Sequence, residues 1–79
     1  MVKVWIKVLQ PGDRADEILG SIERRAKADS IDRLGRWAEV HFSRGDLDYA
    51  EAQKSVEDAQ RECGDGSREF LRVMDSPQD

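Results

Sequence analysis

The sequence predicts one α+β domain whose elements follow in the order strand, helix, strand, strand, helix, strand. Three observations predict it: alternating apolar residues in strand-like segments, two apolar stripes at helical spacing, and turns containing glycine between them. This order is typical of the ferredoxin-like β-α-β-β-α-β fold, in which two helices cover one face of an antiparallel sheet and the opposite face stays open. We expect residues 1–74 to form the domain and residues 75–79 to form a flexible tail.

The first predicted strand covers residues 2–9, and a helix follows the turn at Pro11 and Gly12. Asp13 is expected to cap this helix, because its carboxylate can accept hydrogen bonds from unpaired backbone N–H groups. The core side of the strand holds Val2, Val4, Ile6 and Val8. The apolar stripe of the helix holds Ala15, Ile18, Leu19, Ile22 and Ala26.

A hairpin is predicted next, from a short strand at 31–34 and a stronger one at 36–43, joined at Gly35. The core side of the second strand holds Ala38, Val40 and Phe42. In the ferredoxin-like arrangement this strand lies beside the first strand at the centre of the sheet.

The second helix is the clearest in the chain. Asp48 and Glu51 form a capping box at its start, and Gly64 ends it. Its apolar stripe holds Tyr49, Ala52, Val56, Ala59 and Cys63. Residues 68–74 are predicted as the last strand, with a helix as the alternative.

Composition restricts the classes of function. The 79 residues include 17 acidic and 13 basic side chains, for a formal net charge of −4. This charge disfavours direct binding to nucleic acid or to an anionic membrane. Nothing in the chain has the length of apolar sequence that spans a bilayer. Cys63 is the one cysteine and cannot form an internal disulfide, so a reducing cytoplasm is the expected location.

The sequence shows no group of side chains arranged for catalysis, so we expect no enzyme activity, no catalytic residue and no cofactor. His41 is the one histidine, and it projects to the open face, whereas Cys63 lies on the buried stripe across the sheet. A cysteine–histidine dyad needs contact at about 3 Å. No pair of cysteines or histidines has a metal-ligand spacing, and no metal site is predicted.

Two tryptophans lie on the side of the strands that the core does not use. Trp5 and Trp37 are expected to be neighbours on the helix-free face. The predicted surface holds Lys3, Trp5, Lys7, Trp37, Glu39 and His41. Exposed indoles favour burial against a partner protein or in a homodimer. The alternatives are base stacking of single-stranded RNA, as in RRM domains, or cover by the tail or a loop.

The second helix is acidic: between residues 46 and 62 there are six acids and two bases. One flank of the helix holds Asp48, Glu51, Asp58 and Glu62. Such a carboxylate row can block a basic surface of a nucleic-acid-binding protein, as nucleic-acid mimics and anti-CRISPR proteins do. The leading hypothesis is therefore a small, acidic, non-enzymatic inhibitor or accessory factor. The alternative is a solvated helix face that keeps the protein in solution.

One segment resembles a known family. Residues 33–40 read RLGRWAEV, similar to the R-V-G-K-Y-I-E-L type segment of the PurS subunit of formylglycinamidine ribonucleotide synthase, and residues 9–12 read LQPG, similar to its L-K-P-G. The resemblance implies a non-catalytic structural subunit of a biosynthetic complex that assembles through its sheet. The sequence thus leaves two hypotheses of protein binding, one on the helix flank and one on the sheet face.

Overall fold

The computed structural model describes residues 2–43 and 45–74, with only the backbone of Asp65. The elements are β1 (Val2–Val8), α1 (Asp13–Ala26), β2 (Ser30–Leu34), β3 (Trp37–Phe42), α2 (Tyr49–Glu62), the 3-10 helix η1 (Asp65–Glu69) and β4 (Leu71–Met74). The predicted order is confirmed, with η1 added before the last strand. The tail predicted at 75–79 lies outside the described residues.

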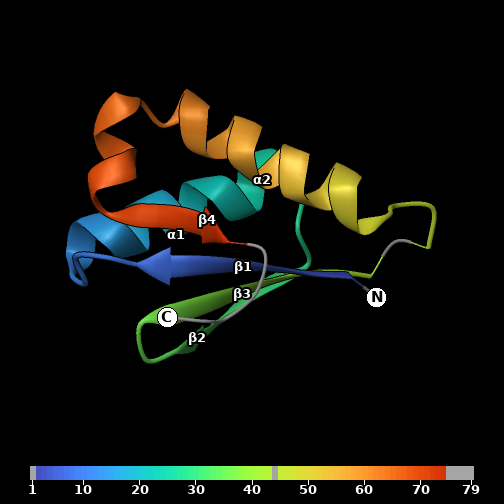
Figure 1. Cartoon of the computed structure of the whole chain (residues 1–79), viewed down its shortest axis with the longest axis horizontal. Coiled ribbons are helices and arrows are strands. Elements are labelled where there is room, and N and C mark those ends of the chain that lie inside the picture. The colour runs from blue at the N-terminus through green and yellow to red at the C-terminus, as the bar shows by residue number, and fades with distance from the viewer. Residues whose placement is uncertain (1, 44, 75–79) are drawn as a thin grey trace.

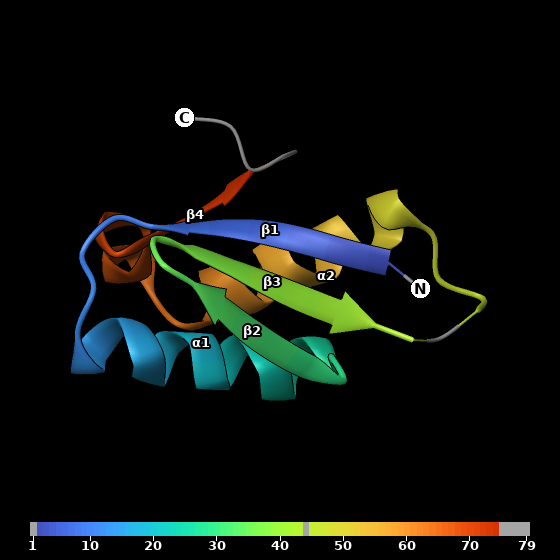
Figure 2. The same cartoon turned by 90° about the horizontal axis from the view of Figure 1, so that it is seen from below.

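The four strands form one antiparallel sheet in the order β2-β3-β1-β4. Both helices lie on the same side of this sheet, and the strands form the opposite layer (Figure 1). Turned by 90°, the molecule shows the strands in front and both helices behind them (Figure 2). This is the ferredoxin-like topology, with β1 and β3 at the centre and one face free of helices.

The core lies between the sheet and the helices. The predicted stripe of α1 is buried along its whole length, as are Val4, Ile6 and Val8 of β1. On β3, Ala38, Val40 and Phe42 are fully buried. Alternate residues of β1 and β3 are buried against the apolar stripes of the helices. The residues between them therefore face outward, on the side of the sheet that the helices do not cover. None of the helices in the part of the chain that the structure describes is long and apolar enough to cross a bilayer.

The helix starts differ from the predictions in two places. Asp13 is the first helical residue of α1 rather than its cap, because Gly12 takes the cap position with φ +151° and no side-chain capping bond forms. In α2 the backbone N–H of Glu51 donates to Oδ1 of Asp48 at 2.8 Å, so the predicted cap is confirmed. Tyr49 is 38% exposed and does not join the core, because it lies in the first turn before the buried stripe begins at Ala52.

The last strand is shorter than predicted. Residues 65–69 form η1, and β4 begins at Leu71 instead of Arg68. Ser67 explains the difference: its Oγ lies 3.0 Å from the carbonyl oxygen of Gln60 and 2.8 Å from that of Gly64. The N–H of Phe70 also donates to the carbonyl of Ser67 at 3.1 Å. The bonds that link Ser67 to Gly64 and to Phe70 close tight turns, and the bond to Gln60 ties η1 to the end of α2, so the segment before Leu71 is not extended.

Candidate functional site

A tryptophan pair lies near the centre of the helix-free face. Trp5 of β1 and Trp37 of β3 meet edge to face, with ring centroids 6.3 Å apart and an interplanar angle of 89°. The prediction that they are neighbours is confirmed. Each ring covers part of the other, so both are half-buried rather than fully exposed. The Nζ of Lys7 lies 5.8 Å from the Trp37 centroid, within the range of a cation–π contact.

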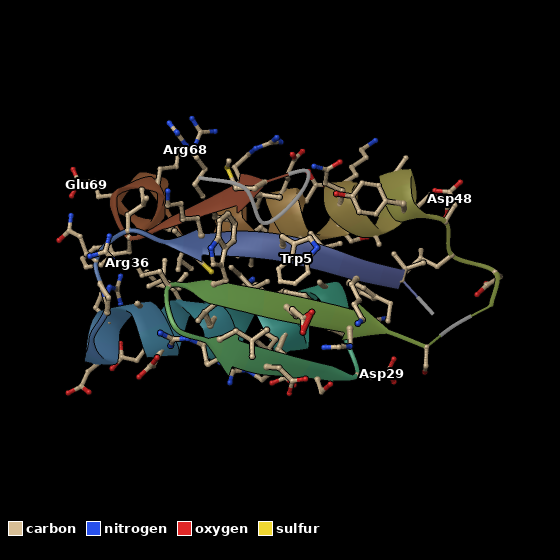
Figure 3. All side chains as sticks on the ribbon, turned by 60° about the horizontal axis from the view of Figure 1, so that its bottom comes forward. Trp5, Asp29, Arg36, Asp48, Arg68 and Glu69 are labelled. Atoms are coloured by element: carbon tan, nitrogen blue, oxygen red, sulfur yellow. The ribbon has the colours of Figure 1, made fainter. Side chains whose placement is uncertain are left out.

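The strand register places further side chains around this pair. We define the helix-free face as Lys3, Trp5, Lys7, Ser30, Asp32, Leu34, Trp37, Glu39, His41, Arg72 and Met74. The six residues predicted from sequence all belong to it. Figure 3 shows this side of the sheet, with Trp5 lying over β1 and the helices behind. The face therefore extends over all four strands, and β2 and β4 contribute residues that the prediction missed.

The helix-free face carries opposite charges on its two halves. Asp32 and Glu39 are paired across β2 and β3. Lys7 and Arg72 are paired across β1 and β4, and Lys3 is also on β1. Between the charged pairs lie the two indoles, and Leu34 stands at the edge with 52% of its surface exposed. The face thus has an acidic half, a basic half and an apolar centre.

Three side chains of the acidic half converge on one point. The Nε2 of His41 lies 3.1 Å from Oδ2 of Asp32 and 3.6 Å from Oε2 of Glu39. The other oxygen of Glu39, Oε1, lies 3.9 Å from Nζ of Lys3. The imidazole and the Glu39 carboxylate are only 16% and 12% exposed, whereas Asp32 is 61% exposed. We call these three residues the carboxylate–imidazole cluster.

The sequence prediction placed Glu39 and His41 on one face but missed Asp32. Glu39 and His41 are two residues apart on β3, which puts them side by side. Asp32 joins them through the hairpin, whose two-residue loop at Gly35 and Arg36 sets Asp32 opposite Glu39. Gly35 has φ +64°, which suits the first position of such a loop. A two-residue loop that begins at Gly35 pairs Leu34 with Trp37 and therefore Asp32 with Glu39, so the glycine in the sequence could have predicted the cluster.

The acidic flank of α2 is engaged within the chain. Oε2 of Glu62 lies 3.0 Å from Nη1 of Arg25 on α1, and Oδ1 of Asp58 lies 3.7 Å from Nη1 of Arg61. Asp48 caps its own helix by accepting from the N–H of Glu51. Asp58 and Glu62 also share a shallow groove between the helices with Arg25 and Lys27. The flank therefore lies beside basic residues, and its local charge is mixed.

Cys63 and His41 lie on opposite sides of the sheet, as predicted. Cys63 is half-buried against the core, and its Sγ lies 3.4 Å from Oγ of Ser21 on α1. His41 projects from β3 on the helix-free face. The two side chains cannot act as a dyad in this fold.

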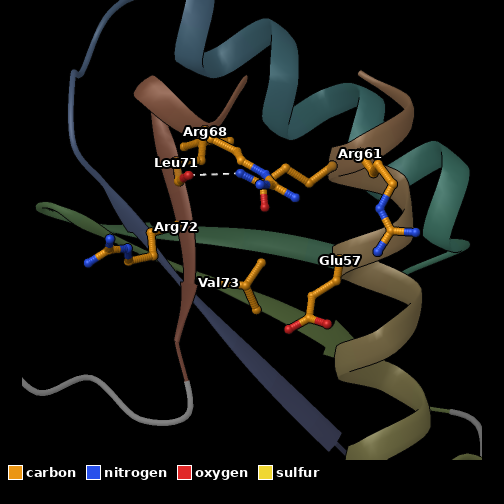
Figure 4. Close-up of a pocket in the computed structure, with 7 residues that line it drawn as sticks. Glu57, Arg61, Arg68, Leu71, Arg72 and Val73 are labelled. Atoms are coloured by element: carbon orange, nitrogen blue, oxygen red, sulfur yellow. Dashed lines mark hydrogen bonds between the residues drawn. The ribbon is translucent and has the colours of Figure 1, made fainter. Parts of the chain in front are cut away.

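An open groove of about 450 Å³ lies between α2, η1 and β4. Its residues include Arg61, Arg68 and Arg72, which would suit an anion if their guanidinium groups met (Figure 4). They do not meet: Arg72 extends from the opposite side of β4, away from α2. The amide of Gln60 donates to the carbonyl of Leu71 at 2.7 Å and is already engaged. The groove does not form a convergent anion site.

Fold and surface together define a ferredoxin-like α+β domain whose open sheet face bears an aromatic centre between halves of opposite charge. Comparison of the chain with protein-family models, with curated proteins and with solved structures gives no match in any of the three.

Proposed function

We propose that this chain is a non-enzymatic protein-binding module that pairs with a second copy of itself through the helix-free face. The observation that carries the proposal is the half-buried tryptophan pair set between an acidic and a basic half. Tryptophan is among the residues that contribute most binding energy at protein interfaces. Assembly through the sheet is also what the resemblance of residues 33–40 to PurS implies.

The distribution of charge favours a second copy as the occupant. Homodimers are built mostly on a two-fold axis, which brings the same patch of both copies together. A two-fold axis in the plane of the face, through the tryptophan pair and tilted from the strand direction, would place the β2–β3 half of one copy over the β1–β4 half of the other. The tilt is needed because Asp32 and Glu39 lie level with Trp5 and Met74 along the strands, whereas Lys7 and Arg72 lie level with Trp37 and Leu34. Asp32 and Glu39 would then face Lys7 and Arg72 of the second copy, twice per dimer. The two aromatic centres would meet on the axis.

The size of the face sets the expected strength. Four strands about 4.8 Å apart and about 20 Å long give a patch of modest area. A standard interface buries about 800 Å² of each partner, roughly one-sixth of the 4914 Å² accessible surface of this chain. A single small sheet face supplies that area at most, so we expect a dimer with a dissociation constant in the micromolar range.

Substitution of the tryptophans tests the proposal. Trp5→Ser and Trp37→Ser should each weaken dimerisation by about 30-fold or more, the effect of losing an interface hot spot worth about 2 kcal/mol. Sedimentation velocity over a concentration series from about 1 µM to 1 mM would measure the change. Circular dichroism of each variant verifies that the fold survives.

Tyr49→Ser is the matched control, because Tyr49 is an exposed aromatic on α2 and lies off the helix-free face. It should leave the dissociation constant within about twofold. A wild-type chain that remains monomeric at 1 mM would overturn the proposal, as would equal weakening by Tyr49→Ser and Trp5→Ser.

A further inference from the structure

We infer that the carboxylate–imidazole cluster of Asp32, Glu39 and His41 binds a divalent transition-metal cation of the zinc class. The site lies within one copy of the chain, on the acidic half of the helix-free face, so a bound cation and the second copy of the proposed dimer would compete for the carboxylates of Asp32 and Glu39. Its three ligands would be one imidazole nitrogen and two carboxylate oxygens, the ligand types that zinc accepts in proteins with open positions.

The geometry of the donor atoms suits such an ion. The ligand atoms of the three residues all lie within 4.8 Å of one another. Two ligands of a tetrahedral ion with bonds of about 2.0–2.1 Å lie about 3.3–3.4 Å apart. The Nε2 of His41 lies 3.1 Å from Asp32 and 3.6 Å from Glu39, on either side of that value. Asp32 is the most exposed of the three, so its carboxylate has room to adjust.

The surroundings of the His41 Nε2 atom also favour a ligand. Its Nε2 atom is buried and makes no hydrogen bond of acceptable geometry to any residue that the structure describes, although two carboxylate oxygens lie close to it. Buried polar atoms normally have a partner, and an exception calls for an explanation. A cation between the imidazole lone pair and the carboxylates would satisfy all three groups.

The surrounding charges permit a divalent cation. Asp32 and Glu39 face each other directly across the hairpin, and like charges at such a position repel. The ammonium of Lys3 reduces this repulsion, because its Nζ lies 3.9 Å from Oε1 of Glu39. With a neutral imidazole, two carboxylates and one ammonium leave a local charge of −1, which attracts a cation. The free positions of the ion would point away from the sheet.

The single histidine makes the test direct. Tag-free protein, labelled with ¹⁵N, would be titrated with Zn²⁺ alone while long-range ¹H–¹⁵N spectra follow the two imidazole nitrogens. We expect the Nε2 resonance to move to the metal-bound range and to saturate at one Zn²⁺ per chain. Calorimetry of the same titration gives the affinity.

Asp32→Asn and His41→Gln should each weaken Zn²⁺ binding by at least about 10-fold, since even residues that only orient metal ligands cost about 10–100-fold when replaced. Asp58→Asn is the matched control, as another exposed aspartate with a basic neighbour, Arg61 at 3.7 Å, and should bind as the wild type does. An Nε2 resonance that does not move at saturating Zn²⁺, or equal affinity in Asp32→Asn and wild type, would overturn the inference and leave the cluster as an ion-pair network only.

Discussion

The acidic flank of α2 and the helix-free face are both rich in charged side chains, but their charges are arranged differently. On the flank, Glu62 contacts Arg25 and Asp58 contacts Arg61, so acids lie beside bases of the same chain. On the face, the register sorts acids to one half and bases to the other. Charge density alone therefore does not identify an interaction surface. What distinguishes the face is that its acidic and basic side chains are separated into two halves around an aromatic centre, even though Lys3 contacts Glu39 at 3.9 Å.

Charge reversal on the face is the largest effect expected from this comparison. Asp32→Lys combined with Glu39→Lys makes the helix-free face basic on both halves, so two copies repel where they should attract. The proposal predicts that dimerisation weakens by about 30-fold or more and that the residual affinity rises with salt. Sedimentation velocity at two ionic strengths measures both. Dimerisation at the wild-type level would show that the charged halves do not meet.

A smaller effect is expected at the start of α2. Asp48→Ala removes the side-chain acceptor for the N–H of Glu51 and should lower the free energy of unfolding by about 1 kcal/mol. Urea denaturation followed by circular dichroism measures the loss. Dimerisation should not change, because Asp48 serves its own helix. A dimer weakened together with the fold would mean that α2 takes part in the interface.

The smallest effect is expected from neutralising the flank. The triple variant Glu51→Gln, Asp58→Asn, Glu62→Gln loses ion pairs that are largely exposed, and such pairs contribute about 0–1 kcal/mol each. Its dimerisation should stay within about twofold of wild type. The wild type would instead support the acidic-inhibitor hypothesis if it captured a basic nucleic-acid-binding protein and the triple variant did not. The flank of α2, and not the helix-free face, would then be the interaction surface.

The sequence predicted the elements whose patterns repeat. Val4, Ile6 and Val8 show strict alternation, and the α1 stripe is buried as a whole, so periodicity alone assigned the core. The contact of Trp5 with Trp37 followed from alternation combined with the adjacency of β1 and β3 in the predicted fold.

The features that were missed depend on tertiary geometry. The place of Asp32 opposite Glu39 depends on the hairpin register, which a one-residue shift of the loop would change. The pairing of Glu62 with Arg25 depends on how α1 and α2 pack. The start of β4 at Leu71 depends on hydrogen bonds of Ser67 to residues earlier in the chain. The glycine at the start of the two-residue loop is a local signal for the first of these facts, whereas no local pattern in the sequence indicates the other two.

A mixture of two charge-reversed variants tests most directly whether the acidic half of one copy meets the basic half of the other. Asp32→Lys with Glu39→Lys gives a face that is basic on both halves, and Lys7→Glu with Arg72→Glu gives one that is acidic on both halves. Sedimentation velocity should find that each variant alone dimerises at least about 30-fold more weakly than the wild type, and that a 1:1 mixture forms a heterodimer of about wild-type affinity. If the mixture stays monomeric while the wild type dimerises, the two halves of the helix-free face do not meet across the dimer, and the account is contradicted.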